Sequence, residues 1–420
     1  MRHERTKFAF GSVLLVGVMA LGGCDTSVTN PGPVQDEFLA NPEAHEALVN
    51  GMGRATAQAI NWIGYTGASV TREIHPAGST GSFGITVLWQ RGELSPIDDD
   101  LDTHWEQAQR ARWLAENGIT RMQESGGSQA LLAQAYLWAG YANRLLGENM
   151  CQAVIDGGAP TARTEFLTRA EAAFGQAATL GSGAVKTAAM AGRASVRVHL
   201  GKWAEAVADA GAVPTSFNYY MPYFNTGEEA LLNRIQWSSN SSPYRAHTQW
   251  NTQWEAYYKT TKDSRVAWKE TNEQGDAAID CCGKVPWYPQ MKYPDAAADI
   301  RLSSGREMRL IEAEKQLIDG NWQGAMTAIN AIRTAAGAPA ATAASSAEAW
   351  AMLKRERGIE LWLEARRLGD LRRWSENNTP GALAHLEMVN ADSHLTRQDL
   401  CFPIPPSEQD TNPNVPKATG

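Results

Sequence analysis

Apolar residues begin to recur at helical spacing near Pro42, and this pattern predicts a mainly α-helical chain. Two helices are expected over residues 103–123 and 128–146, where apolar positions recur every three to four residues. Residues 64–102 are instead rich in Gly, Ser and Thr, so they are expected to form loops or a short hairpin.

A faint repeat predicts that helices are paired. "GKWAEAV" begins at Gly201 and "GNWQGAM" at Gly320, and Ala194 and Ala313 each stand seven residues before those glycines. Facing small residues allow two antiparallel helices to approach closely, Gly ends the first helix, and a large residue opens the second. The copies are irregular and separated by long insertions, so the expected fold consists of irregular tetratricopeptide-like helix pairs.

The helical period disappears over residues 214–300, a window that is rich in aromatic side chains. It holds 15 of the 35 aromatic residues, and these alternate with Asn, Gln, Ser, Thr and Pro. Such a loop-rich segment could present rings to the faces of a sugar or dock a partner protein, and the sequence leaves both alternatives open. The candidate ligand-binding residues are Trp250, Trp254, Tyr257, Tyr258, Trp287 and Tyr288.

The N-terminus has the layout of an export signal. A basic start is followed by the apolar run from Phe8 to Leu21 and by small residues before Cys24. This junction resembles the lipobox of bacterial lipoproteins, which predicts a signal peptide over residues 1–23, a lipidated Cys24 and a tether over residues 24–41. An ordinary signal peptide with an incidental cysteine is the alternative.

The overall charge limits the partners of the mature chain. The formal net charge is −8, and removal of residues 1–23, which carry a net +2, makes it more negative. An acidic surface repels nucleic acid and anionic headgroups, so neither is an expected partner. The mean hydropathy is −0.38, and beyond the signal no apolar run is long enough for a membrane span. A lipid is therefore the only membrane attachment that the sequence predicts.

Four cysteines follow the lipidation candidate, namely Cys151, Cys281, Cys282 and Cys401. In an exported protein they are expected to form disulfides rather than a metal site. Adjacent cysteines rarely bond each other, so Cys281 and Cys282 are expected to pair separately, one with Cys151 and one with Cys401. No Cys or His spacing indicates zinc.

The segment "ERGIELWLEARRLGDLRRW", residues 356–374, is densely charged. Glu356, Glu360 and Glu364 recur every four residues, which would place the three carboxylates on one face of a helix. The arginines that alternate with them would hold all the carboxylates ionised, whereas catalysis needs carboxylates with different pKa values. We therefore expect a structural ion-pair lattice, with no catalytic or metal role, formed by Glu356, Arg357, Glu360, Glu364, Arg367, Asp370 and Arg373.

Three segments resemble a known family in content, order and spacing: residues 306–337, residues 356–374 and the proline-rich "FPIPPSEQDTNPN" at 402–414. They are similar to the C-terminal half of SusD/RagB nutrient-binding lipoproteins. The proline-rich segment suits an extended strap across other helices. The resemblance implies a single SusD-like helical domain over residues 42–420, in which the loop-rich segment at about 214–300 is variable.

The resemblance also implies a function. Such a protein is a lipid-anchored outer-membrane component, expected at the cell surface, that binds glycans or other nutrients and partners a TonB-dependent transporter of the SusC type. It would need no cofactor and break no bond. Two alternatives remain, a secreted glycan-processing enzyme and a protein-interaction scaffold of helical repeats.

Overall fold

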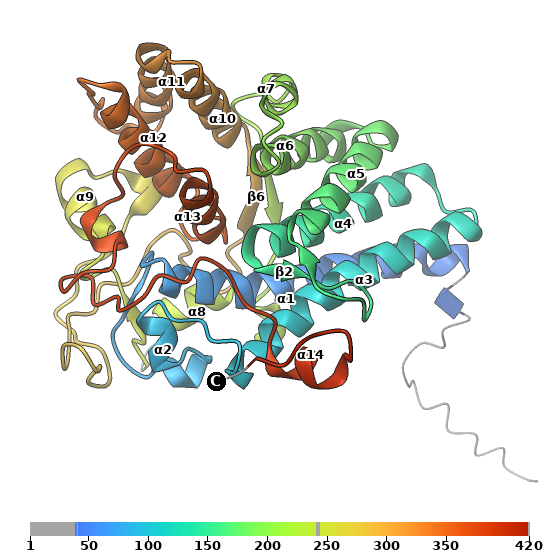
Figure 1. Cartoon of the computed structure of the whole chain (residues 1–420), viewed down its shortest axis with the longest axis horizontal. Helices are drawn as coiled ribbons and strands as arrows, with labels where there is room; N and C mark the ends of the chain where they lie inside the picture. Colours follow the sequence, from blue (N-terminus) through green and yellow to red (C-terminus); the bar gives the residue numbers. More distant parts are fainter. Residues whose placement is uncertain (1–37, 40, 241–243, 419–420) are drawn as a thin grey trace, which may run out of the picture.

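The computed structural model describes residues 38–39, 41–240 and 244–418. The signal segment, Cys24 and most of the tether lie outside the described residues. Figure 1 shows a mostly helical molecule in which short strands are minor elements. The prediction of a mainly α-helical fold is therefore confirmed.

Fourteen α-helices lie in the described part of the chain. They are α1 (His45–Val70), α2 (Val87–Gln90), α3 (Asp102–Glu124), α4 (Gln129–Asn149), α5 (Thr164–Leu180), α6 (Gly183–His199), α7 (Trp203–Gly211), α8 (Arg234–Asn240), α9 (Gln253–Thr261), α10 (Gly305–Ile318), α11 (Trp322–Ala335), α12 (Ser346–Glu360), α13 (Arg367–Glu376) and α14 (Pro406–Thr411). The predicted helices at 103–123 and 128–146 correspond to α3 and α4.

The strands form three antiparallel pairs. They are β1 (His75–Pro76) with β5 (His247–Thr248), β2 (Gln152–Ala153) with β3 (Thr161–Ala162), and β4 (Asn218–Met221) with β6 (Ile300–Ser304). Each pair joins segments that are otherwise loops or helix ends, so the strands fasten the connections between helices.

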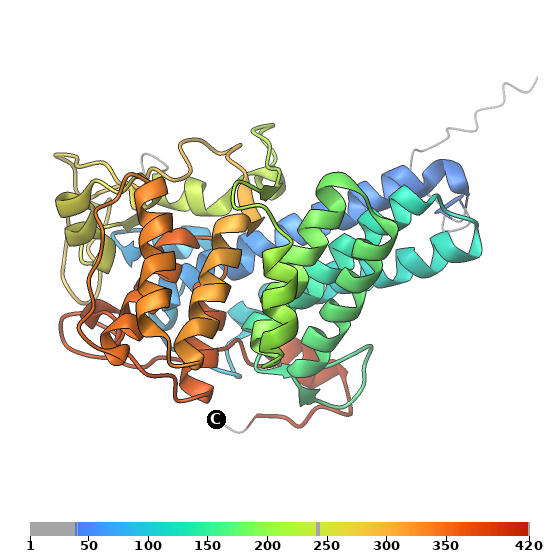
Figure 2. The same ribbon diagram turned by 90° about the horizontal axis from the view of Figure 1, so that it is seen from above.

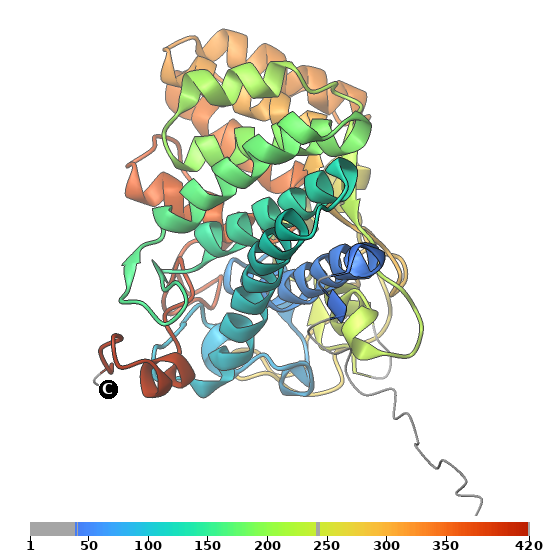
Figure 3. The same ribbon diagram turned by 90° about the vertical axis from the view of Figure 1, so that its right-hand side faces the viewer.

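Helices α3 to α7 stack one on the next, and α7 packs on α10 (Figures 2 and 3). Gly201 and Gly320 both have positive φ, +71° and +81°, in the turns between α6 and α7 and between α10 and α11. A left-handed residue at this place ends a helix, and glycine adopts it without steric cost. The predicted helix pairs are therefore confirmed at both copies of the repeat.

Two close helix contacts depend on glycines that face an aromatic ring. Phe174 of α5 is fully buried between α4 and α6. A Cβ built at Gly140 or Gly192 would lie 2.6 or 2.5 Å from that ring. Small residues at these positions are thus a packing requirement, because a larger side chain would push the helices apart.

Residues 64–102 and 214–300 contain more helix than predicted. Helix α1 runs to Val70, and the Thr and Ser residues in its last turns are buried. Inside the protein Thr66 hydrogen-bonds His104 at 2.7 Å. In the second window α8 and α9 are short helices whose periodic residues are too few to detect. Tertiary packing has overridden weak local preferences in both places.

The two charged and proline-rich C-terminal segments also differ from the predicted shapes. Helix α12 ends at Glu360, and Leu363 and Ala365 adopt left-handed φ values of 58° and 59° before α13 begins. A single helix over residues 356–374 is therefore wrong. In 402–414, α14 interrupts the expected extended strap, with Pro406 in its first turn, where a proline lacks no needed N–H.

The predicted disulfide connectivity is wrong as well. The structure pairs Cys151 with Cys401 and Cys281 with Cys282. Cys151 is held beside the C-terminal segment, because its N–H donates to the Phe402 carbonyl at 2.9 Å. The adjacent cysteines lie in a tight turn closed by the Gly283 N–H on the Ile279 carbonyl at 3.0 Å. The turn brings their sulfurs together and outweighs the general preference against adjacent pairs.

Breaking the helix lets the charged segment reach partners on several elements. All seven residues of the predicted ion-pair lattice are buried. Their ion pairs are Glu356 with Arg265 and Arg333, Glu360 with Arg265, Arg301 and Arg306, Glu364 with Lys292 and Arg301, Arg357 with Asp370, Arg367 with Glu387, and Arg373 with Asp370 and Glu314. Arg366 adds contacts to Glu148 of α4 and Glu307 of α10, at 2.9 and 3.0 Å.

Asp370 is a buried acid of this lattice that lies between two arginines. Its two oxygens accept from Arg357 at 2.8 Å and from Arg373 at 2.9 Å. Burial alone would raise the pKa of Asp370, but the two guanidiniums outweigh burial and hold that pKa far below its usual value. The carboxylate is therefore ionised in the folded protein at any ordinary pH.

We predict that Asp370→Asn lowers the free energy of unfolding by about 3–5 kcal/mol, because it leaves the buried Arg357 without a carboxylate and removes one of the two carboxylate partners of Arg373. The depressed pKa gives stability that is present above the unfolded value near pH 4 and is lost as the pH falls further. Chemical denaturation at pH 7 and pH 3 measures both effects, and the variant should differ less from the native protein at the lower pH.

The matched control is Asp410→Asn, which removes the acid of an exposed ion pair with Lys417. Its free energy of unfolding should change by less than about 0.5 kcal/mol, since solvent screens such pairs. Equal losses from both variants would contradict a special role for the buried lattice.

Candidate functional site

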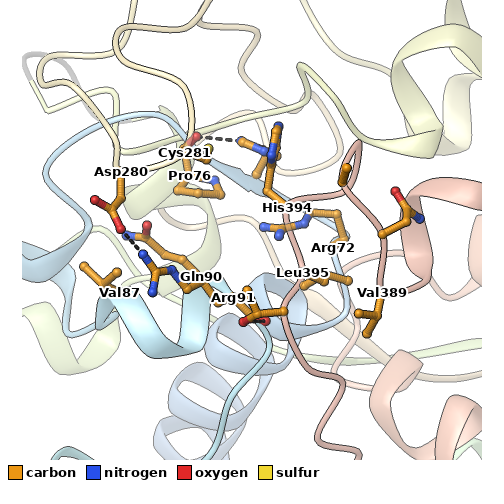
Figure 4. A pocket seen from close by; sticks show the side chains of 14 residues that line it. Arg72, Pro76, Val87, Gln90, Arg91, Asp280, Cys281, Val389, His394 and Leu395 are labelled. Carbon is orange, nitrogen blue, oxygen red and sulfur yellow. Dashed lines mark hydrogen bonds and ion pairs between the residues drawn. The ribbon is translucent and has the colours of Figure 1, made fainter.

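A cavity of about 550 Å³ lies among two neighbouring segments near the N-terminus and two segments that are distant from them in sequence (Figure 4). These segments are the turn after α1, helix α2, the loop with the adjacent cysteines and the loop at 389–396. The volume lies within the range of small-molecule sites, and loops on a rigid helical frame are common places for binding residues.

Arg72 projects into this cavity from a strained backbone position. It follows α1 in a helix-ending turn, in which the Arg72 N–H donates to Ser69 and the Glu73 N–H to Ala68. The left-handed residue of such a turn is usually Gly, but here it is Arg72 with φ 60°. An L-residue in this conformation costs about 1–2 kcal/mol.

The guanidinium of Arg72 is buried, since only 1% of the residue is exposed. None of its three nitrogens has a hydrogen-bond acceptor among the residues that the structure describes. Figure 4 shows it pointing into the space between Pro76 and Leu395. Burial lowers the pKa of Arg72 to about 10, so the side chain remains a cation at neutral pH.

Glu73 holds the Arg72 turn from behind. Its side chain accepts the Leu363 N–H at 3.0 Å, and its carbonyl accepts the Trp362 indole N–H at 3.3 Å. These bonds tie the turn to the break between α12 and α13. Burial raises the pKa of the Glu73 carboxyl from 4.5 to about 7, although the Leu363 N–H, Arg367 and Lys292 partly offset it.

Two histidines line the cavity beside Arg72. His75 donates its Nδ1 proton to the Pro76 carbonyl at 2.8 Å, which leaves Nε2 as an unprotonated nitrogen without a hydrogen-bond partner in the described structure. The His394 ring lies 5.9 Å from the His75 ring, and its Nε2 is 3.2 Å from the Cys282 sulfur. Burial, and next the charge of Arg72, lower the pKa of both histidines.

The ligand atoms of His75, Cys281 and His394 lie within 4.8 Å of one another, a spacing that could suit a metal ion. Cys281, however, is joined to Cys282 and offers no thiolate. Two imidazoles remain beside the positive charge of Arg72, which repels a second cation. The arrangement fits a metal poorly and an anion well.

The mouth of the cavity combines apolar and polar groups. Val87 and Val389 line it and are 47% and 49% exposed. Arg91 forms an ion pair with Asp280 at the same edge (Figure 4). Exposed valines beside charged groups can contact a ligand that has both apolar faces and hydroxyls.

A second hollow, of about 640 Å³, lies between α3 and α14. Its polar side chains already bond one another, because Arg112 pairs with Glu116 and Asp156 and the Trp105 indole donates to Glu408. It offers fewer free groups to a ligand than the cavity at Arg72.

Comparison with known proteins identifies the architecture. Residues 298–420 match the model of the SusD family. A SusD superfamily protein from Bacteroides vulgatus aligns over 90% of this chain and 98% of its own, with a TM-score of 0.65 and 17% identity. Residues 298–420 thus resemble the SusD family, and the chain as a whole has the SusD-like fold.

Two further solved structures agree with this fold. A SusD superfamily protein from Bacteroides thetaiotaomicron has a TM-score of 0.65 at 14% identity, over 89% of this chain and 99% of its own. A SusD-like carbohydrate binding protein from Bacteroides vulgatus has a TM-score of 0.60 at 13% identity, over 90% and 97%. No curated protein matches the chain. None of the described helices could cross a membrane.

Three of the six predicted aromatic residues are core residues. Trp254, Tyr257 and Trp287 are 0%, 5% and 8% exposed. Trp254 packs against Trp362, and the Tyr257 hydroxyl donates to Asp263 at 2.8 Å. The three rings are covered by side chains of the same chain and do not line the cavity at Arg72, so nothing at that cavity supports a binding role for them and the role stays a prediction.

The other three aromatic residues are partly exposed but do not form one surface. Trp250 packs edge-on against the cavity residue His75, with ring centroids 5.2 Å apart, but does not itself line the cavity. Tyr258 and Tyr288 flank Trp268 instead, and Tyr288 stacks on it at 4.8 Å. A ligand-binding role for Trp250, Tyr258 and Tyr288 stays a prediction.

Arg72, His75, Arg91 and His394 were not predicted from the sequence. Arg72 and His75 stand in a short stretch without periodicity, and apart from Pro76 and the residues at α2 their neighbours in the cavity come from position 280 and beyond. The sequence holds one usable signal, the cluster of Arg and His in "TREIH" directly after a long helix.

We predict that Glu73→Gln stabilises the protein at pH 8 by about 1–3 kcal/mol and changes little at pH 5. The raised pKa means that the native carboxyl resists ionisation, so stability falls as the pH rises from about 4.5 to 7. A glutamine keeps an acceptor for the Leu363 N–H and has no charge to bury. Urea denaturation at both pH values measures this difference, and equal effects at pH 5 and pH 8 would contradict the assignment.

Proposed function

We propose that this chain is a SusD/RagB family outer-membrane lipoprotein that binds glycans or related small nutrients in the cavity at Arg72. It passes the bound ligand to a TonB-dependent transporter of the SusC type and carries out no catalysis. The signal at residues 1–23, lipidation of Cys24, the tether at 24–41 and one helical domain over 42–420 belong to the same proposal.

The observation that carries this proposal is a ligand-sized cavity with unused donors in a fold whose solved examples include a carbohydrate binding protein. Sugars present apolar faces and many hydroxyls. The exposed valines at the mouth suit the former, and the Arg72 guanidinium and His75 Nε2 suit the latter. Donor, acceptor and apolar contacts are thus all available in one cavity.

Binding without bond cleavage fits the groups present. Among the residues lining the cavity, Asp280 is the one carboxylate, and it is engaged by Arg91. Glycoside hydrolysis ordinarily needs two carboxyl groups across the scissile bond, one of them free to donate a proton. A glycan-processing enzyme therefore has less support here. A pure scaffold would leave the buried cation and the cavity without a use.

The cavity assignment predicts that Ala391→Trp weakens glycan binding at least tenfold. Ala391 is exposed and lines the cavity, so an indole there would fill space without breaking a buried contact. Titration calorimetry against fractionated plant and host glycans measures the loss, and chromatography of the same mixtures should reveal no shortened products.

The matched control is Ala331→Trp, at an exposed position on α11 away from the cavity. It should bind as tightly as the native protein. Equal affinity in all three proteins would place the glycan site elsewhere, and the appearance of shorter products would favour the enzyme.

The lipoprotein part of the proposal predicts that Cys24→Ser abolishes incorporation of labelled palmitate. The uncleaved or unlipidated chain should then leave the outer-membrane fraction, because no other anchor is expected. Radiolabelling and membrane fractionation test this in the native host. Retention of the label by the variant would show that Cys24 is not the acylated residue.

A further inference from the structure

We propose that the cavity selects sugars that carry an anionic group, a carboxylate or a sulfate ester, and that Arg72 binds this group. The inference rests on the proposed function and adds the substrate class to it. Both groups present oxygen atoms that a planar guanidinium can meet with two parallel hydrogen bonds.

Arg72 differs from every other buried arginine in the described structure. Ten arginines are buried, and nine of them lie within 4.0 Å of a carboxylate oxygen. The exception is Arg72, whose three nitrogens also have no hydrogen-bond acceptor in the described residues. An unpaired buried charge is strongly unfavourable, so Arg72 lowers the stability of the fold. At the other buried arginines a carboxylate offsets the same loss of hydration.

The backbone of Arg72 carries a second cost at the same place. The turn after α1 requires a left-handed residue, and 11 of the described glycines occupy such positions without strain. A glycine after α1 would end the helix equally well but would supply no cation. Strain that persists at a cavity, together with an unpaired charge, is typical of a residue retained for binding.

Arg72 determines the net charge of the cavity, because the other charged groups that line it cancel each other. Arg91 and Asp280 neutralise each other at the mouth. Burial and the charge of Arg72 lower the pKa values of His75, His247 and His394, so these rings are neutral at pH 7. One net positive charge therefore faces the interior, and an anion that enters would gain its attraction in a largely dehydrated setting.

The size of the cavity favours an anion that is part of a larger molecule. A bare sulfate or chloride would leave most of the 550 Å³ to water. A sugar ring would also contact Val87, Val389 and Leu395, which line the same cavity. The anionic group would then fix the orientation of the sugar through Arg72, and the ring would supply the contact area.

Calorimetry with four probes tests this selectivity. The probes are trigalacturonic acid, its neutral methyl ester, a disaccharide with one sulfate ester and inorganic sulfate. We expect trigalacturonic acid, the sulfated sugar or both to bind at least tenfold more tightly than the methyl ester and inorganic sulfate. The two charged sugars separate a carboxylate preference from a sulfate preference.

Arg72→Gly isolates the residue. The variant should fold with an equal or higher melting temperature, because it relieves both strain and an unpaired charge. Its affinity for the preferred charged sugar should fall about 10- to 100-fold, to the level of the neutral ester, as expected for loss of a charge-assisted hydrogen bond. Arg72→Asn, which also tolerates a left-handed backbone, should give the same result.

The matched control is Arg245→Gly. Arg245 is also a left-handed arginine, with φ 38°, but it donates to the Gln274 carbonyl and pairs with Glu273 outside the cavity. Its removal should leave all four affinities unchanged.

Two results would overturn the inference while the proposed function stands. One is equal binding of the neutral ester and the charged sugars. The other is an Arg72→Gly variant that keeps the native preference. Inorganic sulfate binding as tightly as the sugars would mean that the cavity holds a free ion rather than an acidic sugar. Absence of binding to these probes and to every glycan fraction would contradict both proposals.

Discussion

The buried ion pairs around the break between α12 and α13 are the constraint on which the rest of the structure depends. Through Arg366 the break contacts Glu148 of α4 and Glu307 of α10, and through Glu360 and Glu364 it contacts β6. The N-terminal helix stack and the C-terminal helices are thus joined by charges that need specific partners. Buried pairs of this kind add little net stability, but each becomes costly when one partner is missing. They consequently favour one relative arrangement of the two halves.

This constraint also positions the cavity. The break presents the Leu363 N–H and the Trp362 indole to Glu73, one residue after Arg72. Glu73 accepts both bonds only because α12 stops at Glu360 and the chain turns through two left-handed residues. A continuous helix over residues 356–374 would remove this anchor, and the turn that carries Arg72 would lose its support. The lattice and the candidate site are therefore parts of one arrangement.

The sequence predicts features that depend on local repetition. Prediction from the sequence fails where contacts between distant segments determine the structure. The period of apolar residues identifies α3 and α4, and the recurring Gly and Trp identify the turns at Gly201 and Gly320. Alternating charges in 356–374 indicate ion pairs, but the break inside that segment is set by partners on α4, α10 and β6.

The aromatic residues and cysteines show the same limit. Trp250 and Trp254 stand four residues apart in segments of similar composition, yet Trp250 is partly exposed beside His75 and Trp254 is fully buried in the core. Their exposure depends on what packs over each, which composition does not report. The pairing of Cys281 with Cys282 depends on a tight turn that the sequence pattern does not indicate. The cavity forms only where four segments of the folded chain meet.

Arginine has two opposite uses in this molecule, and the difference between them is the strongest reason to regard the cavity as a binding site. In the lattice, arginines such as Arg357 and Arg373 meet carboxylates of the same chain, so their desolvation is offset during folding. At Arg72 the same group is desolvated without a partner, at a backbone position that disfavours any side chain. A chain able to pair nine buried arginines internally has the means to pair a tenth, or to place glycine there. The unpaired Arg72 is explained if the ligand supplies its anionic partner. The electrostatic attraction that Arg72 does not use in the folded protein is then available for binding.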